Sequence, residues 1–402
     1  MESNRSNLSR RKFISSSIVS VASAGFIGIA PQIAFAKEKK NKNIIYRKLG
    51  KTGLKLPIVS MGVMNANNPE IVQASYELGV RHFDTAARYQ FGRNEQIVGN
   101  VIKRLGVRDD VIIGTKVLRP AQREGLNSEQ FKTKLIELCD GSLKRLRSDY
   151  IDILYIHSVS EPNDVNEPGI IEGMKELKKQ GKIRYSGITS HGAMADVINE
   201  MAKTNNYDVV LTAINVTMKD DTALLDAIKN AKSKGIGVIA MKTQAGGQRL
   251  PNQESLQAYR SSIIATASLK WVMRNENIAT AIPGYTNFDH MKEDFSVAFD
   301  LDYTTEEESF LSDNNIKLGM GFCKQCKLCM ASCPNGVDVP SLMRTHMYST
   351  QYCNFHLARD VLNDIPQAKG IQTCGTCNSC TAKCVNYVDI GKKIEELKLI
   401  YT

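Results

Sequence analysis

Two sequence features that would identify common classes of protein are missing from this 402-residue chain. No G-x-G-x-x-G follows the first apolar strand candidate, so the dinucleotide fingerprint of doubly wound α/β folds is absent. No arginine-rich patch with interleaved aromatic residues occurs either, and we therefore expect no nucleic-acid partner.

A strongly apolar membrane span is also missing. The apolar stretch at residues 14–34 contains five serines, two glycines and Pro31, which makes it weak for a permanent span. It follows a twin-arginine motif, S-R-R-K-F-I at 9–14, and A-F-A at 34–36 offers a small-x-small cleavage site. We expect 1–36 to be a signal peptide for the twin-arginine export machinery, which would place the protein in the periplasm. Retention of the leader as a membrane anchor is the alternative.

Cysteine, in contrast, is abundant and patterned. Eight of the ten cysteines form two copies of C-x₂-C-x₂-C-x₃-C, at 323–333 and 374–384. Bacterial runs with this spacing hold 4Fe–4S clusters, and the fourth cysteine of one run ligates the other cluster. We therefore predict two 4Fe–4S clusters with crossed ligation. The predicted ligand sets are Cys323, Cys326, Cys329 and Cys384 for the first cluster, and Cys374, Cys377, Cys380 and Cys333 for the second.

Other uses of these cysteines fit less well. Structural zinc usually takes two separated cysteine pairs rather than two runs of four. Disulfides between cysteines so close in sequence would close very short loops and constrain the unfolded chain little. Of the two remaining cysteines, we expect Cys139 in the core and Cys353 near a cluster.

The predicted export route and the predicted clusters are consistent with each other. The twin-arginine route carries folded proteins, so clusters can be inserted in the reducing cytoplasm before export. Reduced thiolates beyond the membrane are reasonable only when iron already holds them.

The net charge gives little reason to expect a polyanionic partner. The formal charge is +10, of which the leader contributes +3, so the mature chain carries about +7. Two oxidised clusters with four thiolates each would bring this to roughly +3. The basic run at 37–43, K-E-K-K-N-K-N, is most simply a solvated linker.

Between about 44 and 300, eight short apolar runs alternate with amphipathic helical stretches such as 131–146. Regular alternation over this length predicts an α/β fold, a (β/α)₈ TIM barrel over 44–315. A doubly wound open sheet is the alternative. The predicted strands are Ile58–Met61, Arg81–Asp84, Val111–Thr115, Tyr150–Tyr155, Ile183–Ile188, Asp208–Ala213, Gly235–Met241 and Ile278–Ile282.

Four polar residues follow or end these strands, where barrels carry their catalytic groups. Asp84 ends the second strand, Lys116 follows the third, His157 follows the fourth, and Tyr89 lies in the loop after Asp84. A buried lysine beside the tyrosine would lower the pKa of the phenol, and Asp84 would keep the lysine charged. The histidine could orient a substrate oxygen. Each residue alone also has an ordinary structural explanation, but together they indicate proton transfer at an oxygen.

Motifs in this region resemble, in order, those of the aldo/keto reductase family. The resemblance covers roughly residues 44–300 and implies a (β/α)₈ barrel whose tetrad is Asp84, Tyr89, Lys116 and His157, with Tyr89 as general acid. A branch of that family carries a carboxyl-terminal ferredoxin-like extension, as this chain does. The motifs are R-K-L-G (47–50), T-G-L (52–54), V-S-M-G (59–62), F-D-T-A-x-x-Y (83–89), N-E (94–95), G-T-K (114–116), D-I-L-Y-I-H (152–157), I-R-Y-S-G-I (183–188) and I-P-G (282–284).

The same resemblance implies NAD or NADP as a cofactor, but the positions that grip the nicotinamide differ. Ser190 stands where the family usually has asparagine, Leu211 where it has glutamine, and Met241 where it often has an aromatic residue. The pyrophosphate region is better matched, and His290 stands where an arginine often holds a 2′-phosphate, so a preference for NADP has no support. The residues implied there are Lys242, Thr243, Gly246, Gly247, Gly284, Thr286, Asn287 and His290.

Residues 316–402 are expected to form a mainly α-helical dicluster ferredoxin-like domain. Between the cysteine runs, Asp338 and Pro340 mark a helix start, and apolar residues line helical faces. Before this domain, 300–315 is expected to be a last barrel-flanking helix or a linker.

The sequence therefore predicts an exported oxidoreductase that interconverts a carbonyl and an alcohol of a small, sugar-like substrate by hydride transfer. The two clusters would exchange electrons with a redox partner protein. The alternative is an electron-transfer protein whose barrel binds substrate or partner without using nicotinamide. A barrel that serves only as an interaction scaffold is a third possibility, against which the tetrad weighs.

Overall fold

The structure is a computed structural model, of which we describe residues 43–119, 126–245, 259–316 and 321–402. The predicted leader and the pair Gly246 and Gly247 lie outside these ranges. None of the helices within them combines the length and the apolar character needed to cross a membrane.

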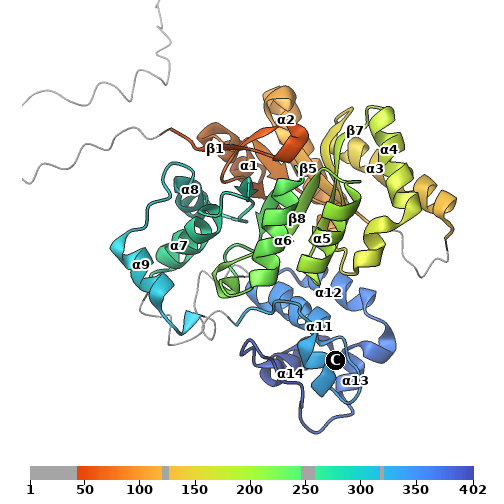
Figure 1. Ribbon diagram of the computed structural model, residues 1–402, viewed down its shortest axis with the longest axis vertical. Helices are drawn as coiled ribbons and strands as arrows, with labels where there is room; N and C mark the ends of the chain where they lie inside the picture. The colour runs from red at the N-terminus through yellow and green to blue at the C-terminus, as the bar shows by residue number, and fades with distance from the viewer. Residues whose placement is uncertain (1–42, 120–125, 246–258, 317–320) are drawn as a thin grey trace, which may run out of the picture. The chain divides into compact units, whose positions relative to one another are not determined.

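Eight parallel strands form a single sheet in the order β3 to β10 (Figure 1). The sheet closes on itself, because Val59 pairs in parallel with Ala281 of the last strand and Ser60 N donates to Ala281 O at 2.8 Å. The predicted (β/α)₈ barrel is therefore confirmed, and the open doubly wound alternative is wrong. The strands are β3 (Met61–Gly62), β4 (His82–Asp84), β5 (Ile112–Leu118), β6 (Ile151–His157), β7 (Ile183–Ser190), β8 (Val209–Ala213), β9 (Gly237–Met241) and β10 (Thr280–Ala281).

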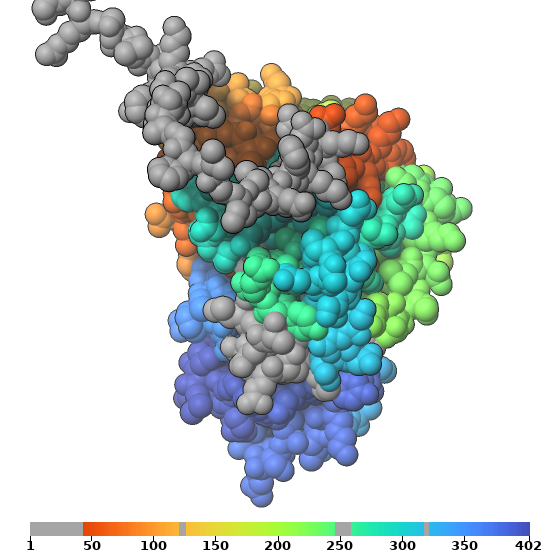
Figure 2. Space-filling model, turned by 90° about the vertical axis from the view of Figure 1, so that its left-hand side faces the viewer, coloured from red at the N-terminus to blue at the C-terminus, as the bar shows by residue number. Residues whose placement is uncertain are grey.

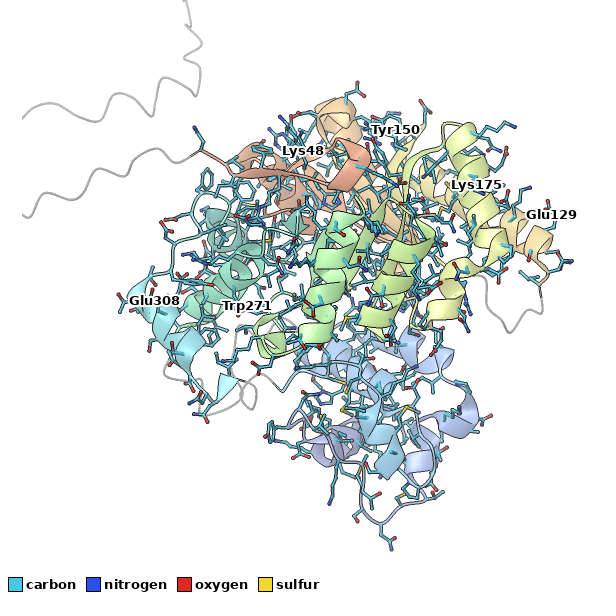
Figure 3. All side chains as sticks on the ribbon, viewed as in Figure 1. Lys48, Glu129, Tyr150, Lys175, Trp271 and Glu308 are labelled. Carbon is cyan, nitrogen blue, oxygen red and sulfur yellow. The ribbon has the colours of Figure 1, made fainter. Side chains whose placement is uncertain are left out.

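Helices surround the barrel and present charged residues outward. Glu129 on α3 and Lys175 on α4 lie on outer helix faces (Figure 3), while the apolar faces pack on the buried strands. Cys139 of α3 is fully buried, as expected. The helices are α1 (Pro69–Leu78), α2 (Arg93–Leu105), α3 (Ser128–Leu146), α4 (Pro168–Lys179), α5 (Met194–Thr204), α6 (Thr222–Ser233), α7 (Ser261–Met273), α8 (Phe288–Ser296) and α9 (Thr305–Ser312).

A hairpin that the sequence pattern did not reveal precedes the barrel. Strands β1 (Tyr46–Lys48) and β2 (Lys55–Pro57) pair antiparallel, and the turn between them packs on the amino end of β9. Gly50 in this turn has φ +53°, and a Cβ there would lie 2.3 Å from Gly235 O. Only glycine fits this approach, so the G of the R-K-L-G motif has a structural role.

The residues after α9 form a small helical domain with its own core, in contact with the barrel (Figure 2). Asp338 caps its first long helix, as the sequence predicted, by accepting from Ser341 N at 3.2 Å. Its apolar core includes Leu342, Ile394 and the sulfur-bearing Cys329. The helices are α11 (Val339–His346), a π turn (Met347–Gln351), α12 (Phe355–Asp364), α13 (Ile371–Cys374) and α14 (Ile390–Tyr401).

Candidate active site and cysteine cavities

Asp84, Tyr89, Lys116 and His157 converge at one end of the barrel. Buried Lys116 forms an ion pair with Asp84 and also donates to Thr85 O at 2.7 Å. The Lys116 ammonium lies 5.1 Å from the centre of the Tyr89 ring, and that ring meets the His157 ring edge-on with 6.0 Å between centroids. Lys116 and His157 were expected just beyond their strands, but β5 and β6 extend to include them.

A buried network holds the strand ends that carry these groups. Thr115 donates to the fully buried carboxylate of Glu95 at 2.6 Å, and Arg145 pairs with the other Glu95 oxygen at the same distance. Thr85 donates to Asn94 at 2.7 Å. The N-E motif therefore positions the ends of β4 and β5.

The barrel interior just below Asp84 is polar. Asp84 Oδ2, the Tyr155 hydroxyl and both His82 ring nitrogens are buried and have no hydrogen-bond partner within the described residues. A Cβ at Gly114 would lie 3.2 Å from Asp84 Oδ2 and from the Tyr155 ring, so the glycine of G-T-K leaves room for this layer. Burial lowers the pKa of His82 to about 3, which keeps its ring neutral.

The electrostatics of Tyr89 differ from the sequence-based expectation, which was wrong in direction. Burial, followed by the negative charge of Asp84, raises the pKa of Tyr89 well above its ordinary value. The Lys116 ammonium does not outweigh these two effects, because it is paired with Asp84. Burial likewise lowers the pKa of Lys116 and raises the pKa of Asp84, each opposed by the partner's charge. Tyr89 is therefore a protonated phenol.

Two neutral histidines lie beside the phenol. Burial first, then the charge of Lys116, lowers the pKa of His157 well below its ordinary value, and its Nδ1 has no hydrogen-bond partner in the part of the chain described. His191, which sequence reasoning missed, follows β7 with its ring centroid 6.4 Å from that of His157. Its pKa is also lowered well below the ordinary value, by burial and then by Arg344.

A cleft of about 530 Å³ opens above the tetrad. Asp84, Tyr89 and Lys116 line it together with His191, whereas His157 lies behind them. Of the residues implied for a dinucleotide, the cleft is lined by Met241, Lys242, Thr243, Gly284, Thr286 and His290.

The other residues implied for a dinucleotide lie elsewhere. Ser190 is fully buried and donates its hydroxyl to Gly192 O at 2.9 Å. Leu211 is a core residue of β8. Asn287 caps α8 by accepting from His290 N at 2.8 Å. Ser190, Leu211 and Asn287 are therefore not among the residues that line the cleft.

The loop after β4, which carries Tyr89, is held by the carboxyl-terminal domain. Arg88 forms ion pairs with Asp364 at 3.1 Å and with Asp360 at 3.6 Å, both on α12. Phe91 stacks on His356 with ring centroids 3.5 Å apart. Phe91 has φ +55°, a conformation that non-glycine residues adopt only where surrounding contacts enforce it.

The π turn of the same domain forms one wall of the cleft. Tyr348 and Tyr352 lie with their ring centres 4.7 and 4.6 Å from the Lys242 ammonium. Burial opposes the charge of Lys242, but the two phenols raise the pKa of the ammonium on balance. Cys353, which was expected near a cluster, instead lines this cleft and is exposed. No sequence pattern indicated that these residues return to the barrel mouth.

The eight patterned cysteines surround two separate cavities. Cys323, Cys326 and Cys329 share one cavity with Cys384 of the second run. The other cavity is lined by Cys374, Cys377, Cys380 and, from the first run, Cys333. The fourth cysteine of each run thus lies with the first three of the other, which is the grouping that crossed ligation requires.

These cavities have the character of cluster sites. Among the residues described, no three His, Cys, Asp or Glu side chains converge closely enough to hold one metal ion. Burial, followed for Cys374 by the charge of Cys333, raises the pKa of Cys323 to about 12 and that of Cys374 to about 11. Four such thiolates need a positive centre between them, and the core of an iron–sulfur cubane would supply that charge.

Amide groups donate to the cysteine sulfurs. Gln325 Nε2 lies 3.4 Å from Cys323 Sγ, and Asn335 Nδ2 lies 3.1 Å from Cys377 Sγ. Asn386 N lies 3.3 Å from Cys384 Sγ. Hydrogen bonds to sulfur are one of the means by which proteins set cluster potentials.

Comparison with known proteins agrees with both halves of this description. Residues 59–309 match the model of the aldo/keto reductase family, and 322–389 match a 4Fe-4S dicluster domain. An L-galactose dehydrogenase from Arabidopsis thaliana is 27% identical over 302 residues, 66% of this chain and 92% of that protein. An L-glyceraldehyde 3-phosphate reductase from Escherichia coli is 24% identical over 335 residues, 68% of this chain and 94% of that protein.

Solved structures show the same barrel. A holo aldo-keto reductase from Bacillus halodurans is 26% identical and superposes with a TM-score of 0.55, over 67% of this chain and 95% of its own. An aldo/keto reductase from Klebsiella pneumoniae, solved with NADP and acetate, is 22% identical with a TM-score of 0.51, over 65% of this chain and 92% of its own.

The grouping of cysteines predicts which cluster each variant loses. Cys333→Ala should abolish or alter the cluster held by Cys374, Cys377 and Cys380, although Cys333 belongs to the first run. Cys384→Ala should affect the cluster of the first run instead. Electron paramagnetic resonance of the reduced variants, purified without oxygen, measures this. If Cys333→Ala altered only the first-run cluster, the crossed ligation would be wrong.

Proposed function

Because this chain belongs to the aldo/keto reductase family and carries a 4Fe-4S dicluster domain, we propose that it interconverts a carbonyl and an alcohol of a small, sugar-like substrate. Two 4Fe–4S clusters exchange electrons with a redox partner protein. The observation that carries this proposal is the convergence of Tyr89, Lys116 and Asp84 on the cleft at the barrel mouth.

Tyr89 is the proton donor in the direction of carbonyl reduction. Its raised pKa keeps the phenol protonated, and its ring lies at the cleft. As the phenol gives its proton to the substrate oxygen, the nearby Lys116 ammonium stabilises the charge that develops on Tyr89. Asp84 holds that ammonium in place, and the neutral ring of His157 packs edge-on against the Tyr89 ring.

The cleft fits a dinucleotide in part. Lys242, Thr243, Thr286 and His290 line the side where phosphates would lie, and Gly284 leaves space there for a close approach. A bound nicotinamide would supply the hydride that reaches the carbonyl carbon. Ser190 and Leu211 lie out of reach, so the carboxamide would be held by other groups or more loosely than is usual in the family.

The substrate class is supported by the relatives. Two of them carry names that denote sugar or sugar-phosphate substrates, galactose and glyceraldehyde 3-phosphate. We propose a small polyhydroxylated carbonyl compound for this chain too, in a cleft whose described walls mix polar and apolar side chains.

Export rests on the amino-terminal motif alone. We propose that residues 1–36 direct the folded, cluster-loaded protein through the twin-arginine machinery to the periplasm, with retention of the leader as the alternative. Free nicotinamide is not expected there, so a dinucleotide would be bound before export and recycled in place.

A second candidate function follows from the lack of the usual contacts to a nicotinamide carboxamide. In this alternative the clusters carry electrons and the barrel binds a substrate or partner. A pocket lined by Cys323 shares Lys242 and His191 with the cleft, so a bound molecule would lie near the first cluster. In this case the protein is an electron-transfer protein whose barrel binds substrate without nicotinamide.

Replacement of Tyr89 by phenylalanine tests the proposed proton donor. We expect kcat for carbonyl reduction to fall by about 10²-fold or more, because general-acid catalysis contributes about 10²–10⁴-fold. In the unaltered protein, kcat for reduction should stay flat up to about pH 10, while alcohol oxidation should accelerate with pH, because it needs the deprotonated phenol. Steady-state rates across pH measure both.

Tyr76→Phe is the matched control. Tyr76 lies on α1, away from the cleft, and its exposed hydroxyl donates a hydrogen bond to Asp110. It should leave kcat unchanged. Full activity of Tyr89→Phe, or an equal loss in both variants, would remove the tetrad mechanism.

Cofactor release distinguishes the two candidate functions. If nicotinamide is retained, acid denaturation of the exported protein should release about one NAD or NADP per chain, detected by enzymatic cycling of the supernatant. If none is released, and the intact protein also fails to bind added NADH or NADPH, the barrel works without nicotinamide.

A further inference from the structure

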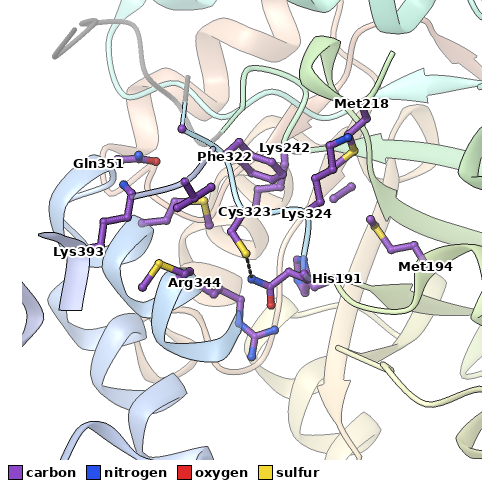
Figure 4. A pocket seen from close by; sticks show the side chains of 16 residues that line it. His191, Met194, Met218, Lys242, Phe322, Cys323, Lys324, Arg344, Gln351 and Lys393 are labelled. Atoms are coloured by element: carbon purple, nitrogen blue, oxygen red, sulfur yellow. Dashed lines mark hydrogen bonds between the residues drawn. The ribbon is translucent and has the colours of Figure 1, made fainter. Parts of the chain in front are cut away.

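A pocket between the barrel and the carboxyl-terminal domain is lined by apolar side chains and four cations, without any acid (Figure 4). Lys242 follows β9, and Arg344 lies on α11. Lys324 follows Cys323 in the first cysteine run, and Lys393 lies on α14. No Asp or Glu is among the sixteen residues that line it. We call this space, which His191 and Gln351 also line, the junction pocket.

Arg344 is a cation of the junction pocket with an unsatisfied buried donor. Its Nε is buried without a hydrogen-bond partner, and no carboxylate in the described ranges forms an ion pair with its guanidinium. After burial, the charge of Arg344 is the largest cause of the lowered pKa of His191. Arg88, by comparison, has two aspartate partners. A half-buried guanidinium without an acid is costly unless an anion from outside completes it.

Lys242, a second cation of the junction pocket, also lacks an acidic partner among the described residues. The Lys242 ammonium faces the rings of Tyr348 and Tyr352 but no carboxylate among the described residues forms an ion pair with it. An anion held by Arg344 could take charge-assisted hydrogen bonds from its planar fork.

The size of the junction pocket suits a group rather than a whole molecule. Its volume is about 30 Å³, and a water-sized group needs ~10–15 Å³ by the same measure. That is room for the two or three oxygens of a carboxylate or phosphate.

The junction pocket adjoins the catalytic cleft. His191, Lys242 and Gln351 line both spaces. A molecule whose carbonyl lies at Tyr89 can therefore extend past His191 and place its far end at Arg344. Gly284 and Thr286, which are implied for dinucleotide phosphates, line the cleft but not the junction pocket, whereas Lys242 lines both.

We propose that the junction pocket binds the anionic group, a carboxylate or phosphate, of the substrate whose carbonyl is reduced at Tyr89. The inference rests on the proposed function and narrows its substrate to anionic polyhydroxy carbonyl compounds. It makes Arg344, a residue of the cluster domain, a specificity determinant for chemistry in the barrel.

Binding of matched anionic and neutral ligands to the full-length, cluster-loaded protein tests the proposal. The pairs are galactonate against galactitol and glycerol 3-phosphate against glycerol, measured by isothermal titration calorimetry. The anionic member should bind at least about tenfold more tightly, and Arg344→Gln should weaken it by about 10- to 100-fold, the loss expected for hydrogen bonds to a charged group. Neutral ligands should bind the variant unchanged.

Arg359→Gln is the matched control, because Arg359 is an exposed arginine on α12 of the same domain. It should leave all affinities within about twofold, and iron content should be equal in both variants. Equal weakening in both variants, or none in Arg344→Gln, would overturn the subsite. NADH is titrated in parallel. A loss confined to NADH in Arg344→Gln would show that the anion is a dinucleotide phosphate and overturn the substrate assignment.

The same titrations separate this inference from the proposed function. Intact anion binding without turnover of any carbonyl compound would contradict the proposed function and leave the subsite standing.

Discussion

The docking of α12 on the loop after β4 is the contact on which the candidate active site depends. Arg88 pairs with Asp360 and Asp364, and Phe91 stacks on His356, so the segment that carries Tyr89 is fixed from outside the barrel. Left-handed backbone at Phe91 adds a local cost that these contacts must exceed. The carboxyl-terminal domain is therefore part of the site as well as a carrier of clusters. Without it, the barrel would keep Asp84 and Lys116 but would lose the support of the phenol.

Burial sets the protonation states at the barrel mouth. The Asp84–Lys116 pair is internally neutral, so it holds the site's geometry without drawing the proton from Tyr89. Both histidines stay uncharged because burial and the surrounding cations oppose a second positive charge. What remains is a surplus of positive charge from Lys242 and Arg344, with aromatic rings but no acids around it. Such a site favours neutral-to-anionic substrates and a phenol that gives up its proton only in the transition state.

Much of this architecture could be predicted from the sequence because its signals are local. Each of the eight apolar runs overlaps its strand in the barrel. The overlap is smallest for the first run, Ile58–Met61, which shares only Met61 with β3. Cysteine spacing is likewise local, and it predicted which residues would line each cavity. The missed features depend on tertiary contacts. Tyr348, Gln351 and Arg344 have ordinary helical surroundings in the sequence, and only the docking of their domain brings them to the cleft. The predicted direction of the Tyr89 pKa shift was wrong for the same reason. The effect of Lys116 on the phenol depends on its pairing with Asp84, which is a tertiary contact.

The most direct test of this account is the iron and acid-labile sulfide content of the full-length chain, purified without oxygen. We expect a cubane in each four-cysteine cavity, and the cavity lined by Cys323 lies directly beside the barrel mouth. The expected content is therefore about eight iron and about eight sulfide ions per chain. Folded protein that holds zinc or no metal in these cavities would contradict it.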